Sequence, residues 1–365
     1  MKGNNVNSPP PHGGDVLRAS RDYHIPRDQW LDLSTGINPD PYPVDHISPD
    51  SFFQLPYIAP EFNDAVTRYY AHDHFLAVAG TQVAIQALPQ ILANDAVLLP
   101  DVGYQEHALH WQKCGAKAMF YSAMHEGDLV SSINKHVEHN RAQHIVIINP
   151  NNPTTACVSK QQIFAWAKQL VAGYYVIVDE AFVDAEPEKG VLTADTLPEN
   201  MIVLRSFGKF FGLAGVRLGF VFAHKKLLNV LKDHIGLWQV NGPAQDIAIQ
   251  ALNNVAWQER AREKIVEANQ LTQRIFLPLV SLRIHQQSIV MAAYHNPLFS
   301  SYVMHTINAE KIHQFLAQHA ILTRIVPMKN ELVILRIGNV SEKAITKNSQ
   351  LQRIVHQCVD SLASC

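Results

Sequence analysis

The sequence lacks paired cysteines, long hydrophobic runs and an excess of charge of either sign. Four cysteines in 365 residues show no paired spacing, so we expect reduced thiols. No apolar stretch reaches membrane-spanning length, and the N-terminus has no apolar segment typical of a secretion signal. A net charge of −2 without a basic stripe argues against nucleic acid as a partner. We therefore expect a cytoplasmic protein with a small-molecule substrate.

Nineteen histidines raise the question of a metal site. The close pairs lack a matching cysteine or carboxylate cluster, and all lie in polar helical or loop contexts. We interpret them as solvated surface histidines and predict no metal. The pairs are His72 and His74, His107 and His110, and His136 and His139.

The composition is that of a globular protein, with 47% hydrophobic and 17% charged residues, and the length allows two domains. The first ~40 residues are rich in Pro, Gly, Asn and Asp and predict an extended arm without regular structure. We expect an arm over 1–45 that packs with the small domain, a large domain over 46–258 and a small domain over 259–365.

Short apolar strands alternate with amphipathic helices in the large domain. This alternation predicts an α/β fold: a three-layer, mostly parallel sheet with helices on both faces. The later segments predict a smaller α+β domain. Expected strands are 96–100, 117–122, 144–149, 174–179, 201–206 and 216–223, then 288–293, 321–325 and 332–337; expected helices include 83–92, 159–171, 225–235, 259–276 and 309–319.

Lys209 stands in an apolar, glycine-punctuated run, with Ser206 three residues before it and Arg217 eight after. Desolvation disfavours the charged form of a lysine, so the neutral amine can condense with a carbonyl. Ser206 and Arg217 suit a phosphate, and a lysine beside a phosphate anchor indicates pyridoxal phosphate. The alternative is a buried strand–turn–strand whose lysine extends to the surface.

Two further segments offer groups for such a cofactor. Gly80, Thr81 and Gln82 precede a helical run, where backbone N–H groups and the helix dipole attract an anion. Thr81 as an ordinary N-cap is the alternative. In the turn Asn149–Thr154 (NPNNPT), two prolines hold the asparagine amides, and Asn152 could donate to a ring oxygen, although a plain turn is also possible.

Asp179 ends an apolar strand, and a carboxylate emerging there requires a partner. A protonated pyridine nitrogen would satisfy it; the alternative is an N-cap or loop acid, as we interpret Glu180. Tyr104 follows another strand and could stack on a flat ring, although such a tyrosine often only packs beneath a loop.

Taken in order, these motifs resemble the fold-type I pyridoxal-phosphate enzymes of the aminotransferase class I/II group, over nearly the whole chain. The resemblance implies a Schiff-base role for Lys209, a pyridine-nitrogen partner in Asp179 and a stacking aromatic in Tyr104. It also implies catalytic roles for these three, and a homodimer. By position, Asn152 matches the family residue that binds the ring oxygen of the cofactor, and Arg336 matches the arginine that binds the substrate carboxylate. The residues that match the family's site for the cofactor phosphate are Gly80, Thr81, Gln82, Ser206 and Arg217.

Within this group, His12–Asp15 and Leu31–Pro39 are similar to the threonine-phosphate decarboxylase branch of cobalamin synthesis. That likeness implies His12 and Arg324 as ligands of a substrate phosphate, with Gly36 in the substrate site. The alternatives are an aminotransferase acting on histidinol phosphate or a related amino acid, and a cofactor-binding protein without catalysis.

Several positions depart from the family pattern. Phe182 replaces a tyrosine, Gly208 a hydroxyl residue and Thr155 a glycine. Leu55 occupies the position where the family often has a tyrosine that reaches the cofactor phosphate of the neighbouring subunit. Tyr57, close by in the sequence, could take the role of that tyrosine.

Overall fold

The computed structural model describes residues 12–92, 95–192, 197–341 and 350–364. By its contacts the chain divides into two compact units. Of the described residues, the first comprises those in 41–259, and the second comprises those in 12–40 and from 260 onward. We refer to them as the first and second units and describe each by itself.

The first unit is built on a seven-stranded sheet in the order β2-β8-β7-β6-β5-β3-β4. β8 runs antiparallel to both of its neighbours, whereas the other neighbouring pairs are parallel. The prediction of a mostly parallel sheet is therefore confirmed. The strands are β2 (Phe75–Val78), β3 (Ala96–Pro100), β4 (Lys117–Tyr121), β5 (His144–Ile148), β6 (Val176–Asp179), β7 (Met201–Ser206) and β8 (Gly219–Ala223).

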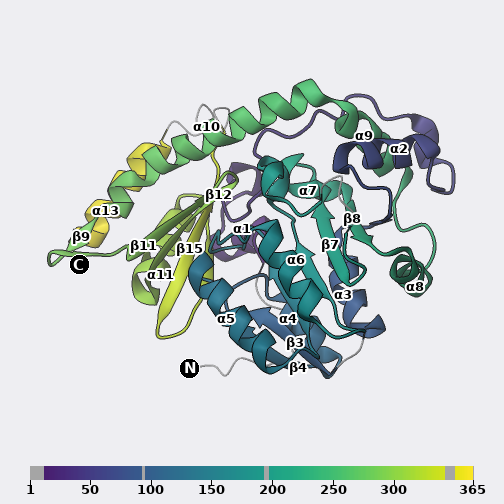
Figure 1. Ribbon diagram of the computed structural model, residues 1–365. Helices are drawn as coiled ribbons and strands as arrows, with labels where there is room; N and C mark the ends of the chain where they lie inside the picture. Colours follow the sequence, from purple (N-terminus) through teal and green to yellow (C-terminus); the bar gives the residue numbers. More distant parts are fainter. Residues whose placement is uncertain (1–11, 93–94, 193–196, 342–349, 365) are drawn as a thin grey trace. The chain divides into compact units, whose positions relative to one another are not determined.

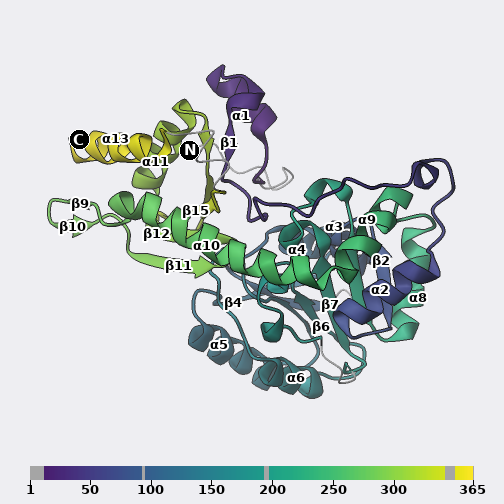
Figure 2. The same ribbon diagram turned by 90° about the horizontal axis from the view of Figure 1, so that it is seen from above.

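Helices cover both faces of this sheet, as the prediction of three layers requires. Figure 2 shows α5 and α6 on one side and α3 and α4 on the other. Side chains of α3, α4 and α8 pack with β3, β5, β6 and β7 in one apolar core. The helices of this unit are α2 (Pro60–Tyr70), α3 (Thr81–Ile91), α4 (Glu106–Lys113), α5 (Glu126–His139), α6 (Lys160–Gln169), α7 (Phe207–Phe210), α8 (Lys225–Ile235) and α9 (Gly242–Asn253).

The second unit holds a four-stranded antiparallel sheet in the order β11-β12-β15-β14, the α+β pattern expected (Figure 1). A short parallel pair joins β1 to β13, so residues near the start of the chain lie beside residues 321–322. The strands are β1 (Leu31–Asp32), β9 (Arg283–Ile284), β10 (Gln287–Ser288), β11 (Ala292–Asn296), β12 (Phe299–His305), β13 (Ile321–Leu322), β14 (Arg324–Pro327) and β15 (Leu332–Gly338). The helices are α1 (Val16–Tyr23), α11 (Thr306–Gln318) and α13 (Leu351–Ala363), and α10 (Val255–Val280) enters from the first unit.

The structure corrects the expectation that the early chain has no regular structure. Residues Val16–Tyr23 form α1, because the Asp15 side chain accepts a hydrogen bond from the Arg18 N–H (3.0 Å) and caps the helix.

The expected strand 216–223 begins only at Gly219, after a 3-10 turn at Ala214–Val216. The expected strand 321–325 is divided into β13 and β14. The sequence pattern did not predict β2 and β12. In the described part of the chain, no helix combines the length and apolarity that crossing a membrane requires.

Candidate functional site

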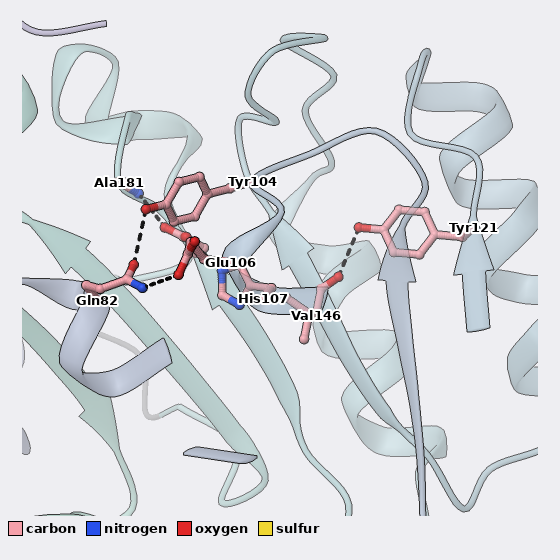
Figure 3. Close-up of polar contacts among 8 residues, drawn as sticks. Gln82, Tyr104, Glu106, His107, Tyr121, Val146 and Ala181 are labelled. Atoms are coloured by element: carbon pink, nitrogen blue, oxygen red, sulfur yellow. Dashed lines mark hydrogen bonds and ion pairs between the residues drawn. The ribbon is translucent and has the colours of Figure 1, made fainter. Parts of the chain in front are cut away.

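Asp179 ends β6 at the carboxyl edge of the sheet, the edge where parallel α/β sheets bind ligands. Its carboxylate is buried, and one oxygen lies 2.9 Å from Nε2 of the equally buried His107. The other oxygen accepts the Ala181 N–H at 3.1 Å (Figure 3). These contacts satisfy a charge that burial would otherwise make costly. The interpretation of His107 as a solvated surface residue is therefore wrong.

The NPNNPT turn follows β5, the strand next to β6. Its first and third residues hold the loop: the Asn149 amide donates to the Val158 carbonyl (3.1 Å), and the Asn151 amide donates to that of Val102 (2.8 Å). Both Asn–Pro peptide bonds of the turn are cis. Asn152 is 9% exposed, so this rigid turn presents its side chain at a largely buried position.

Lys209 lies in the single-turn helix α7, directly after β7. Its Nζ stands 5.4 Å from the ring centroid of Phe182, three residues beyond Asp179. A Cβ on Gly208 would lie 2.8 Å from Cα of Ala214, so the close chain approach leaves no room for the hydroxyl side chain common in the family. The glycine is thus a packing requirement of this turn.

A cationic cradle occupies the N-terminus of α3. Gly80, the N-cap, has φ +80°, and a Cβ there would lie 2.4 Å from Nη2 of Arg217. The Arg217 guanidinium is held by the carbonyl of Ala214 (3.0 Å). The N-cap of α3 is Gly80, and Thr81 is its first helical residue, so the alternative of an ordinary threonine N-cap is wrong. A guanidinium beside a helix N-terminus suits a phosphate.

Tyr104 lies between β3 and α4, with its ring near that of His107 (centroids 6.3 Å apart, edge to face). Its hydroxyl donates to the side-chain oxygen of Gln82 at 3.1 Å. The Gln82 amide nitrogen in turn donates to the Glu106 carboxylate at 2.5 Å (Figure 3). The two predicted residues therefore contact one another.

Near the ends of β6 and β7 lies a buried ionic cluster that the sequence pattern did not predict. Arg205 of β7 lies 2.7 Å from a carboxylate oxygen of Asp184 and 3.1 Å from one of Glu180. Burial raises the pKa of Glu180 to about 7, although Arg205 and the Val191 N–H act in the opposite direction. The interpretation of Glu180 as a cap or loop acid is wrong, since it is fully buried.

In the second unit, Arg336 of β15 is buried, and its Cα partner across the sheet is Arg324 of β14. The guanidinium donates to the Ser34 carbonyl. Burial, and then the charge of Arg324, lower the pKa of Arg336 to about 9, while Asp32 acts in the opposite direction. An anion bound between the two arginines would offset this repulsion.

A pocket of about 400 Å³ in the second unit lies between α1, α11 and β14. Four basic side chains line it, together with Asp15 and Asp22: His12, Arg18, His313 and Arg324. Nδ1 of His313 lies 2.8 Å from the Thr323 hydroxyl, and burial lowers the pKa of His313. Gly36 is buried in the loop after β1 and does not line the pocket.

The predicted residues thus form two groups, one in each unit. The first unit holds the cofactor candidates, with Ser206 at the end of β7, and the second holds His12, Gly36, Arg324 and Arg336. The residues missed are His107, Glu106 and Arg205. The first two follow Tyr104 closely in the chain, so their place after β3 was the available signal. In the described residues, no cluster of His, Cys, Asp or Glu has the geometry of a metal site.

Comparison with known proteins identifies the family. Residues 31–319 match the family model described as aminotransferase class I and II. The chain belongs to this family. It is 35% identical over 314 residues to a threonine-phosphate decarboxylase of Pseudomonas aeruginosa, covering 86% of this chain and 88% of that protein.

Two histidinol-phosphate aminotransferases extend the comparison. A histidinol-phosphate aminotransferase of Buchnera aphidicola subsp. Schizaphis graminum is 29% identical over 218 residues, covering 60% of this chain and 58% of that protein. Among solved structures, a histidinol-phosphate aminotransferase from Sinorhizobium meliloti, in complex with pyridoxal-5'-phosphate, superposes with a TM-score of 0.77. It covers 98% of this chain and 100% of its own at 18% identity, which shows the shared fold.

The site chemistry fits pyridoxal phosphate, the cofactor that the family implies. A phosphate fits the cradle of Gly80 and Arg217, where a Cβ would intrude. The buried Asp179 carboxylate can accept a hydrogen bond from a protonated pyridine nitrogen, because its contacts with His107 and the Ala181 N–H hold it in one orientation. The amine of Lys209 lies one strand away, at the end of β7.

The cradle yields the first testable prediction. Gly80→Ala places a Cβ against Arg217 and a side chain at a positive φ, so we expect the dissociation constant of pyridoxal phosphate to rise about 10- to 100-fold. Absorbance titration of the apoprotein measures it. Gly215→Ala is the matched control, because nothing lies within 4 Å of its Cβ position. Equal affinity in the two variants would contradict the assignment of the cradle.

Proposed function

We propose that this chain is a pyridoxal-phosphate-dependent lyase that decarboxylates L-threonine O-3-phosphate to (R)-1-amino-2-propanol O-phosphate. This reaction belongs to the making of the aminopropanol side chain in cobalamin biosynthesis. The observation that carries the proposal is the arginine pair Arg324 and Arg336, opposite each other on β14 and β15. The 35% identity to a threonine-phosphate decarboxylase over most of both chains supports it.

We assign the residues of the first unit to the cofactor. Arg217, Gly80, Thr81 and Ser206 would bind its phosphate, and the Asp179 carboxylate would accept a hydrogen bond from its protonated ring nitrogen. Asn152 would donate to the ring oxygen. When bound, pyridoxal phosphate supplies an electron-withdrawing ring that accepts the electron pair of a bond broken at the substrate's α-carbon.

The substrate carries two anionic groups, and the second unit offers cations for both. Arg336 binds the α-carboxylate through its planar guanidinium, and Arg324 and His12 bind the phosphate. The buried Arg336 gains most from this pairing, because burial and Arg324 have already disfavoured its charge.

With the cofactor bound, the Lys209 amine would hold its aldehyde and would then be free to carry a proton. When the Cα–carboxylate bond breaks, carbon dioxide leaves, and a proton must replace it on the α-carbon. Nζ of Lys209 would donate that proton. The Tyr104 ring would pack against the cofactor.

An aminotransferase acting on histidinol phosphate is the second candidate. The family includes such enzymes, and one is 29% identical to this chain over 218 residues. It would use the same lysine to move the α-proton to an acceptor instead of releasing carbon dioxide.

The decisive assay incubates the holoenzyme with L-threonine O-3-phosphate and no 2-oxoacid, and measures released carbon dioxide. We expect stoichiometric release of carbon dioxide and aminopropanol phosphate, and a loss of at least about 10³-fold in Lys209→Ala, which lacks the proton donor. Turnover that requires a 2-oxoacid acceptor, without carbon dioxide, would contradict the decarboxylase and favour the aminotransferase.

Two variants in the same assay test the phosphate ligand. Arg324→Ala is expected to raise KM for threonine phosphate by about 10- to 100-fold, because a charge-assisted contact is lost. Arg21→Ala removes a cation of α1 that does not line the pocket and serves as the control.

We further propose that the protein works as a homodimer. In the first unit, the segment 52–58 exposes large apolar side chains, including Phe53 (81% exposed) and Leu55 (60%). Trp238 adds to it, with its ring 6.4 Å from that of Tyr57. Exposed apolar surface of this kind is typical of a protein interface.

Light scattering coupled to size-exclusion chromatography tests the dimer. We expect twice the mass of one chain for the wild type and a shift to the monomer for Phe53→Asp combined with Leu55→Asp, which charge the exposed apolar segment. Val171→Asp charges another exposed apolar position of this unit and should leave the mass unchanged. A monomeric wild type would contradict the proposal.

A further inference from the structure

A chain of polar contacts in the first unit runs from helix α4 to the ring of Tyr104. His110 and Glu106, one turn apart on α4, lie 3.2 Å apart through Nε2 and Oε2. The same Glu106 oxygen accepts the side-chain amide of Gln82 of α3 at 2.5 Å. Gln82 then accepts the Tyr104 hydroxyl at 3.1 Å (Figure 3). Four side chains from two helices and one loop are thereby linked.

The chemistry of Glu106 determines which way the Gln82 amide faces. An ionised carboxylate only accepts hydrogen bonds, so the NH₂ group of Gln82 must face it. The amide oxygen is then directed to Tyr104, whose hydroxyl can donate. The reverse orientation would set two acceptor oxygens against each other across the 2.5 Å contact. Glu106 therefore selects the orientation of Gln82.

His110 supports this arrangement at the same carboxylate oxygen. Its ring nitrogen shares Oε2 with the Gln82 amide, and Glu106 is buried, with only 5% of its surface exposed. Hydrogen bonds to a buried carboxylate are worth more than those in water, because the surroundings screen them less. The two donors fix the carboxylate in one rotamer.

We propose that Glu106 and His110 are positioning residues that hold the Tyr104 ring in one orientation through the Gln82 amide. The inference rests on the proposed cofactor role of Tyr104. The Tyr104 ring lies edge to face with His107, which pairs with Asp179, so its orientation and that of Asp179 are set from one helix. Two consecutive residues of α4 thereby orient two predicted cofactor ligands: Glu106 orients Tyr104 through Gln82, and His107 orients Asp179.

A double-mutant cycle on the full-length protein tests the link. The dissociation constant of pyridoxal phosphate is titrated for the wild type, Glu106→Ala, Tyr104→Phe and the double variant, and the visible circular dichroism of the bound cofactor is recorded. We expect each single variant to raise the dissociation constant about 3- to 10-fold. The double variant should bind no more weakly than the more weakened single variant. Tyr104→Phe keeps the ring and removes only the hydroxyl that Gln82 accepts.

The conservative variant and the control separate positioning from helix stability. Glu106→Gln keeps an acceptor oxygen and should restore binding to within about 2-fold of the wild type, with a wild-type dichroism band. His110→Ala should alter the band in the same sense as Glu106→Ala, but more weakly. Glu126→Ala removes the acid at the first position of α5, the place that Glu106 holds on α4, and should change neither quantity.

The outcomes distinguish this inference from the proposed function. The positioning role alone would be overturned if the fold-changes in the dissociation constant multiplied in the double variant. In that case Glu106→Ala would weaken binding as much in the Tyr104→Phe background as in the wild type. A dichroism band unaffected by Glu106→Ala would do the same. A wild-type apoprotein that binds no pyridoxal phosphate would overturn the proposed function, and this inference with it.

Discussion

The burial of the Asp179 carboxylate is the constraint on which the candidate site depends. A buried charge must be paired, and the partner here is His107, whose ring is itself buried and whose helix α4 begins one residue earlier. Because β6 ends at Asp179, the pair lies at the carboxyl edge of the sheet. The turn after β5 and the lysine helix after β7 follow the two strands that flank β6.

Close backbone approach explains the residue types around this edge. Glycine at positions 80 and 208 leaves room for Arg217 and for the chain at Ala214, respectively. The buried charges next to this edge are paired within the fold, since Arg205 of β7 contacts Glu180 and Asp184 of the segment after β6. A buried ionic cluster therefore ties β7, which precedes Lys209, to the segment that follows Asp179.

The sequence alone predicted a mostly parallel sheet, six of its seven strands and the residues that follow them, because apolar periodicity and the strand-end rule are local signals. It could not predict the partners of those residues. His107 and Asp179 are 72 positions apart, and a histidine in a polar stretch is more often solvated. Glu180 was misjudged for the same reason: its partner Arg205 lies on the next strand of the sheet and contributes no local pattern. Helix α1 was missed because a Gly-rich start concealed the Asp15 cap.

The claim that this edge of the sheet binds pyridoxal phosphate through Lys209 is tested most directly by chemical trapping. The apoprotein is incubated with pyridoxal phosphate, reduced with borohydride, digested and mapped by mass spectrometry. We predict one stable pyridoxyl adduct, on the peptide that contains Lys209, and none in Lys209→Ala. An adduct confined to another lysine, or an unmodified wild-type protein, would contradict it.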